Sequence, residues 1–234
     1  MKDPRIIVAL DCQEEKEALV LMAKLDPSLC RLKIGKELFT ATGPQLVEKL
    51  MRHGFEIFLD LKFHDIPNTV GRACIAAARL GVWMLNVHAL GGSKMLSAAR
   101  DAIPAGQTKL IAVTLLTSMG PRDLREIGIN QTPEQIVQHL ALLALDCGLD
   151  GVVCSALEAK QLRQLITDKF DLITPGIRPI DSTMDDQQRV MTPRQAIENG
   201  SDYLVIGRPI TQADDPLLVL RRLTEEINNQ RSGA

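Results

Sequence analysis

The most informative segment of the chain spans residues 57–69 and reads IFLDLKFHDIPNT. It opens on a nearly continuous apolar run, which is typical of a parallel β-strand covered on both faces. Residues two apart on a strand share a face, so Asp60 and Lys62 point the same way, while Leu59, Leu61 and Phe63 point the other way. The segment therefore predicts a buried strand that ends with a carboxylate and an ammonium group on one face.

Seven further runs of this kind recur along the chain. The eight predicted strands are 5–11, 31–35, 57–62, 84–89, 109–116, 151–155, 172–177 and 203–208. Helical patterns lie between them, with capping boxes expected at Thr132, Ser155 and Thr192. A strand–helix unit repeated eight times within about 250 residues predicts an α/β fold of the (β/α)8 or TIM-barrel type. We expect one domain over residues 1–234, with 117–131 as an extended loop over the barrel mouth; a doubly wound open sheet is the alternative.

The composition argues against nucleic acid and anionic membranes as partners. The 234 residues carry 27 basic and 29 acidic side chains, a net charge of −2, and only 3% aromatic residues. This balance gives no long-range field for nucleic acid or anionic membranes, and there are few rings to stack on bases. Five scattered cysteines without a CxxC pair, no spanning apolar stretch and no signal-peptide pattern predict a reduced, cytoplasmic protein.

Polar side chains end almost every predicted strand, where barrels place their catalytic groups. They are Asp11, Lys33, Asp60, Lys62, Asn86, His88, Thr117, Ser155 and Arg208. A carboxylate beside an ammonium group keeps both ionised, so Asp60 and Lys62 form the centre of the predicted site. An ion pair that only fixes strand register is the alternative for these two residues, and His88 is expected to be a hydrogen-bonded core histidine.

A phosphate site is expected where Gly207 and Arg208 follow the last strand, because backbone N–H groups and a guanidinium both bind anions there. The polar segment 176–190, with Arg178 and Gln187, is a candidate lid. No metal is expected, since the histidines are dispersed and the lysines beside Asp60 would repel Mg²⁺. The residues thus predict a metal-free barrel enzyme for a small phosphorylated compound, with a lysine as proton donor rather than Schiff-base nucleophile.

The motif Asp60-x-Lys62-x-x-Asp65-Ile66-Pro67-x-Thr69 resembles the signature of the orotidine 5'-monophosphate decarboxylase family. Matching segments occur at other strand ends, namely 8–11, 33–35, 86–89, 114–119, 174–178 and 205–210. The resemblance implies a homodimeric barrel that converts orotidine 5'-monophosphate to uridine 5'-monophosphate and CO2 in pyrimidine biosynthesis, without any cofactor or metal.

The resemblance also implies a role for each matching residue. Lys62 would protonate the ring carbon that loses the carboxylate, Asp60 would lie against that carboxylate, Lys33 would support the charged network, and Asp65 would reach into the partner's site. The implied substrate-binding residues are Asp11, Lys33, Asp60, Thr69, Thr117, Arg178, Gln187, Gly207 and Arg208.

Three other functions are weighed against this one. A Mg²⁺-dependent sugar-phosphate lyase or decarboxylase of the same superfamily shares Asp-x-Lys-x-x-Asp, but has an acidic residue in place of Lys33. A non-catalytic nucleotide-binding barrel would not need the intact Asp60, Lys62 and Asp65 set. A nucleic-acid binder is disfavoured by the charge and aromatic content.

Overall fold

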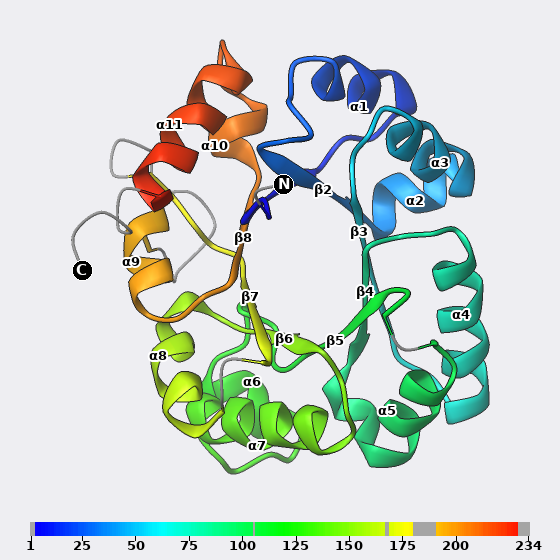
Figure 1. Ribbon diagram of the computed structural model, residues 1–234. Helices are drawn as coiled ribbons and strands as arrows, with labels where there is room; N and C mark the ends of the chain where they lie inside the picture. The colour runs from blue at the N-terminus through cyan, green and yellow to red at the C-terminus, as the bar shows by residue number, and fades with distance from the viewer. Residues whose placement is uncertain (1–2, 105, 167–168, 180–190, 229–234) are drawn as a thin grey trace.

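Eight parallel strands close into a barrel in the computed structural model, which describes residues 3–104, 106–166, 169–179 and 191–228 (Figure 1). The strands are β1 (Ile6–Leu10), β2 (Cys30–Gly35), β3 (Ile57–Phe63), β4 (Met84–His88), β5 (Lys109–Val113), β6 (Gly151–Val153), β7 (Asp171–Thr174) and β8 (Tyr203–Ile206). Because β1 pairs with β8 as well as with β2, the sheet has no edge. The predicted TIM barrel is confirmed, and the open sheet is excluded.

Helices form the outer ring of the barrel. They are α1 (Glu15–Met22), α2 (Lys36–Thr42), α3 (Pro44–Arg52), α4 (Pro67–Arg79), η1 (Ala89–Gly91), α5 (Gly92–Asp101), α6 (Pro121–Glu126), α7 (Pro133–Asp146), α8 (Ala156–Leu165), α9 (Pro193–Glu198), α10 (Arg208–Thr211) and α11 (Pro216–Asn228). The three expected capping boxes are present, at Thr132, Ser155 and Thr192. None of the described helices is long and apolar enough to cross a membrane.

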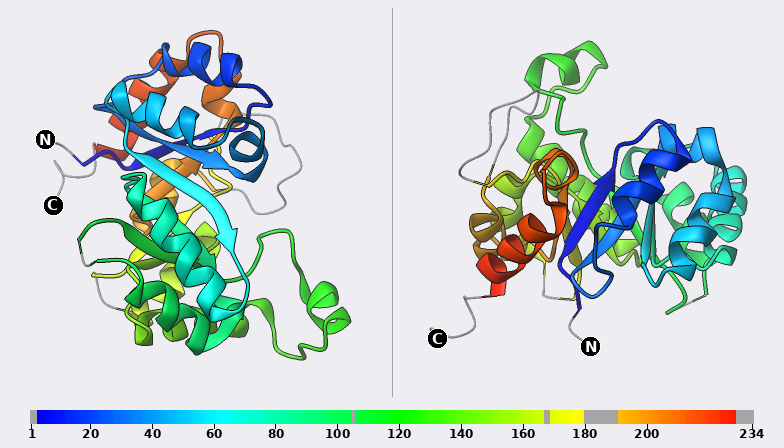
Figure 2. Two further views of the ribbon diagram at one scale, coloured as in Figure 1. Left: turned by 90° about the vertical axis from the view of Figure 1, so that its right-hand side faces the viewer. Right: turned by 90° about the horizontal axis from the view of Figure 1, so that it is seen from above.

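The long fifth connection differs from the prediction. Residues 117–131 contain helix α6, which the capping of Gly120 by Asp123 and the buried Leu124 hold in place. Figure 2 shows α6, in green, projecting beyond the ring of helices, and in the view of Figure 1 it does not lie over the centre of the barrel. The connection is therefore a short helical excursion instead of a loop across the mouth.

Side chains fill the amino-terminal end of the barrel interior. The inner cluster consists of Ile7, Phe58, Met84, Ile111, Ile173 and Tyr203. The Trp83 ring contacts the Tyr203 ring edge-on at 5.1 Å, and the Arg31 guanidinium lies 3.9 Å from the centre of the Trp83 ring. Arg31 also pairs with Asp3 and Glu56. Because this end is closed, space for a ligand remains at the carboxyl ends of the strands, called the mouth below.

Candidate active site

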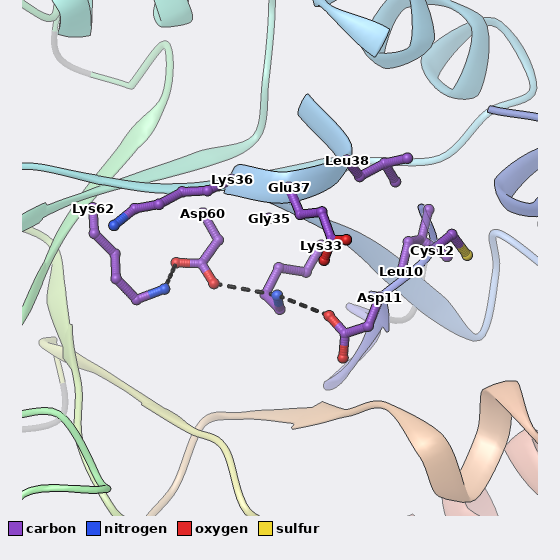
Figure 3. Close-up of a pocket in the computed structure, with 10 residues that line it drawn as sticks. All are labelled: Leu10, Asp11, Cys12, Lys33, Gly35, Lys36, Glu37, Leu38, Asp60 and Lys62. Carbon is purple, nitrogen blue, oxygen red and sulfur yellow. Dashed lines mark hydrogen bonds and ion pairs between the residues drawn. The ribbon is translucent and has the colours of Figure 1, made fainter. Parts of the chain in front are cut away.

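A row of alternating charges crosses the mouth at the ends of β1, β2 and β3 (Figure 3). Lys62 Nζ lies 2.6 Å from Asp60 Oδ1, and Lys33 Nζ lies 3.2 Å from Asp60 Oδ2. Lys33 Nζ is also 3.7 Å from Asp11 Oδ1. The Asp60 side chain is 10% exposed and that of Lys33 12%, whereas Lys62 is more accessible at 26%. A ligand in the mouth therefore reaches the ammonium group of Lys62 more easily than that of Lys33.

The charge of Asp60 depends on its neighbours. Burial raises the pKa of this carboxyl group. The ammonium groups of Lys33 and Lys62 lower this pKa, as do the hydrogen bonds from Lys62 and Asn86. These interactions outweigh burial, and the pKa of Asp60 lies below its usual value. The site thus keeps a buried carboxylate ionised between two cations.

Lys62 has an unusual backbone conformation. Its φ is +52°, and among the described residues it is the one non-glycine residue with a positive φ. A left-handed conformation costs an L-residue roughly 1–2 kcal/mol, so the surrounding contacts have to hold it. Leu61 and Phe63 pack against the outer core, which turns Lys62 towards the mouth as the sequence predicted.

Asn86 on β4, which the sequence placed among the polar strand ends without a role of its own, belongs to the site. It is 1% exposed, its Nδ2 donates to Asp60 Oδ1 at 2.7 Å, and its Oδ1 accepts from the backbone N–H of Lys62 at 2.8 Å. The signal available in the sequence was a polar residue inside an apolar run, two positions before His88.

Two adjoining cavities of about 350 and 270 Å³ open on this row of charges. Both are lined by Asp11, Lys33, Asp60 and Lys62. The smaller one extends across the barrel, and its further lining residues include Thr117, Arg178, Gly207 and Arg208. The structure thus brings together eight of the sequence-predicted site residues, namely Asp11, Lys33, Asp60, Lys62, Thr117, Arg178, Gly207 and Arg208.

Gly207 allows β8 to approach β1 closely. A Cβ atom added at this glycine would lie 3.2 Å from Asp11 Oδ2 and 3.6 Å from Ala9 Cβ. Arg208 follows as the first residue of α10, so a guanidinium group and the start of a short helix lie at the same edge of the cavity. This edge carries the positive charge expected of a phosphate site.

Two predicted site residues lie outside the two cavities, and a third is not among the described residues. Asp65 is exposed, and its Oδ1 accepts from the Ile66 backbone N–H at 2.6 Å in the turn after β3. Thr69 is exposed in the first turn of α4, and neither residue lines the two cavities. Gln187, with most of the candidate lid, falls outside the described residues.

The interpretation of His88 as a hydrogen-bonded core histidine is wrong. Its Nδ1 atom is buried without a hydrogen-bond partner among the described residues, and its ring lies 5.5 Å from that of His64. Burial, followed by the charges of His64, Lys62 and Lys36, lowers the pKa of His88 to about 4. His88 is therefore neutral near pH 7 and adds no charge to the site.

The donor set around Asp60 does not suit a metal ion. Both carboxylate oxygens already face ammonium groups, Oδ1 that of Lys62 and Oδ2 that of Lys33. Within the described ranges, no three His, Cys, Asp or Glu side chains are grouped closely enough to hold a metal ion.

Comparisons with known proteins agree with one another over nearly the whole chain. The family described as "Orotidine 5'-phosphate decarboxylase / HUMPS family" matches residues 4–223. Proteins named orotidine 5'-phosphate decarboxylase from Nitrosospira multiformis and Nitrosomonas europaea are 66% and 64% identical, covering 99% and 97% of this chain and 97% and 98% of their own. The crystal structure of orotidine 5'-phosphate decarboxylase from Lactobacillus acidophilus is similar with a TM-score of 0.87, at 43% identity, over 97% of this chain and 100% of that chain.

Proposed function

The chain belongs to the orotidine 5'-phosphate decarboxylase / HUMPS family, and we propose that it is a carboxy-lyase that converts orotidine 5'-monophosphate to uridine 5'-monophosphate and CO2. We further propose that it does so without metal or organic cofactor, as a step of pyrimidine biosynthesis. The observation that carries the proposal is the buried Asp60 carboxylate held between Lys33 and Lys62 at the mouth of the barrel.

The cavity offers a matching surface for each part of this substrate. The phosphate would bind at Gly207 and Arg208, and Arg178 lines the same cavity. Asp11 and Lys33 would hold the ribose hydroxyls. The pyrimidine ring would then lie over Asp60 and Lys62, where the charge changes during the reaction. Thr117 would lie near the substrate, while the part of Gln187 at the phosphate end stays a prediction from the sequence.

The chemistry follows from these charges. Loss of CO2 leaves the electron pair of the broken C–C bond on a ring carbon, and this carbon then takes a proton. The Lys62 ammonium group stabilises that developing charge and supplies the proton, which favours the transition state over the ground state. Asp60 Oδ1 lies 2.6 Å from the Lys62 ammonium group, and the Asp60 carboxylate lies where the departing carboxylate would bind. Binding of the distant phosphate helps to hold the substrate carboxylate close to the Asp60 carboxylate, although both groups are negatively charged.

The alternative within the same family is a Mg²⁺-dependent sugar-phosphate lyase. Such an enzyme needs carboxylate oxygens free to bind the cation. Here Lys33 Nζ lies 3.2 Å from Asp60 Oδ2, in the space that a divalent cation would need. The position of Lys33 therefore favours the metal-independent decarboxylase.

We also propose that two copies of the chain share their active sites. Asp65 and Thr69 belong to the family signature, yet in the single chain they are exposed and line neither cavity. A closed two-fold dimer would carry Asp65 of each copy to the other's mouth and would cover Ile66, which is 66% exposed.

The role of Lys62 is tested with Lys62→Ala. We expect turnover of orotidine 5'-monophosphate to fall by roughly a thousandfold or more, since both proton transfer and charge stabilisation are lost. The affinity for uridine 5'-monophosphate should stay within about tenfold, because the phosphate end is unchanged. Lys94→Ala, on the exposed side of α5, is the matched control. Turnover like that of the wild type in Lys62→Ala would remove this lysine from the chemistry.

Sharing of sites is tested by mixing two inactive proteins, Lys62→Ala and Asp65→Ala. If Asp65 acts on the partner's site, each hybrid dimer contains one intact site, and random exchange of subunits restores about a quarter of wild-type activity. Mixtures that stay inactive after verified subunit exchange would contradict the shared site, and a fully active Asp65→Ala protein would show that Asp65 is not needed.

A further inference from the structure

The register between β3 and β4 breaks at the charged pair. Leu59 pairs with Leu85 and Phe63 pairs with Val87, so residues 60, 61 and 62 of β3 lie opposite Asn86 alone. A one-residue insertion would turn every later side chain to the other face of the sheet. An insertion of two residues keeps the alternation and adds one inward position, so that Asp60 and Lys62 both face the interior beside a single residue of β4.

Asn86 makes the hydrogen bonds that the interrupted ladder does not. Its Oδ1 accepts from the Lys62 backbone N–H at 2.8 Å, at the residue whose φ is +52°. Its Nδ2 donates to Asp60 Oδ1 at 2.7 Å, the same oxygen that lies 2.6 Å from Lys62 Nζ. One amide thus fixes the backbone of the lysine and the carboxylate of its partner at the same time.

An amide is the side chain that suits this position. It carries a donor and an acceptor on one rigid plane and has no charge of its own. A carboxylate there would repel Asp60, and an apolar side chain would leave the buried Asp60 oxygen and the Lys62 N–H without this partner. Burial of Asn86, at 1% exposure, keeps water from replacing it.

From this geometry we infer that Asn86 is a positioning residue: it sets the place and direction of the Lys62 ammonium group and the orientation of Asp60, without touching the substrate. The inference rests on the proposed function, because it assigns a task to Asn86 in that reaction. Loss of Asn86 should therefore lower the rate of the chemical step more than it weakens binding of the product, which lacks the reacting carboxylate.

The kinetic test compares the wild type with Asn86→Leu, which has the same branching and number of side-chain heavy atoms, and with Asn86→Ser, whose side chain is too short to span both groups. We expect kcat for orotidine 5'-monophosphate to fall roughly ten- to a hundredfold, the equivalent of one hydrogen bond to a charged group. The inhibition constant of uridine 5'-monophosphate should change by less than about threefold. The acid limb of the kcat profile should move to higher pH, since the pKa of Asp60 rises when a donor is removed.

The control is Thr108→Val, which removes a buried hydrogen bond from Thr108 Oγ1 to the Val82 carbonyl at 2.8 Å, far from the mouth. It should lower stability without moving the acid limb. Either of two results for Asn86→Ser would mean that Asn86 has only a structural role. The first is a lower kcat with an unchanged acid limb of the pH profile, and the second is a kcat within about twofold of that of the wild type.

A second readout does not depend on turnover. The Asp60 carboxyl carbon, assigned by NMR with an Asp60→Asn protein, should titrate at higher pH in Asn86→Ser than in the wild type. An unchanged titration overturns the inference about Asn86. Absence of orotidine 5'-monophosphate turnover in the wild type, with the titration moved as expected, would instead refute the proposed function while leaving the positioning of Asp60 by Asn86 in place.

Discussion

Replacing Lys33 with methionine tests how strongly the two lysines hold the buried Asp60 carboxylate. Lys33 Nζ lies 3.2 Å from Asp60 Oδ2, which corresponds to a gross attraction of about 5 kcal/mol at an effective dielectric constant of about 20. Methionine fills a similar volume and removes the cost of burying the ammonium group, which offsets part of this loss. We therefore expect Lys33→Met to lower the free energy of unfolding by about 2–4 kcal/mol near pH 7.

The predicted loss of stability in Lys33→Met depends on pH through the ionisation of Asp60. In the wild type the pKa of Asp60 is lowered on folding, so its ionisation stabilises the fold above the unfolded-state pKa, and this stability is lost as the pH falls through the folded-state pKa. Without Lys33 the folded-state pKa is higher, and Asp60 takes up its proton earlier. The difference in stability between the two proteins should therefore shrink as the pH falls from about 7 to about 4.

Urea unfolding followed by the fluorescence of Trp83 measures both effects. Trp83 is the sole tryptophan, and it lies against Arg31 and Tyr203 at the closed end of the barrel, so its emission reports on global unfolding. Lys94→Met, on the exposed side of α5, is the control for a lost surface charge. A stability loss below about 1 kcal/mol, or an equal loss at both pH values, would refute the idea that Lys33 holds Asp60 ionised.

Two further predictions follow from close contacts. Gly207→Ala places a methyl group 3.2 Å from Asp11 Oδ2, so Asp11 must move; we expect KM for orotidine 5'-monophosphate to rise by roughly tenfold with a smaller change in kcat, and an unchanged KM would argue against the ribose site at Asp11. Arg31→Met removes the contacts of a side chain that is 5% exposed with Asp3, Glu56 and the face of Trp83. Urea unfolding should show that the free energy of unfolding falls by about 2–4 kcal/mol, with kcat unchanged. A fall of less than about 0.5 kcal/mol would mean that these contacts contribute little to stability.

Most of the architecture was predictable because its signals are local. Each strand is a short aliphatic run, and the helices carry capping boxes such as Thr132 with Gln135, which the structure confirms. The pairing of Asp60 with Lys62 followed from the period of two along β3. The predicted strand ends were less accurate. The strand predicted to end at Leu116 is β5, which ends at Val113, where its pairing with Val153 stops.

The remaining features depend on contacts between strands, which a single sequence does not encode locally. The period-of-two argument assumes an unbroken ladder, so it missed the extra residues of β3 opposite Asn86 and the left-handed backbone of Lys62. The stack of Arg31, Trp83 and Tyr203 joins residues far apart in the chain. The environment of His88 depends on His64 and Lys36, which come from other segments.

The most direct test of the account is turnover of orotidine 5'-monophosphate by the EDTA-treated wild-type protein, followed by loss of the orotate-ring absorbance. The charged row of Lys62, Asp60 and Lys33 predicts rapid conversion to uridine 5'-monophosphate, unchanged when Mg²⁺ is added back. No conversion, together with Mg²⁺-dependent cleavage of a hexulose phosphate, would contradict the account and place the chain in the other branch of its family.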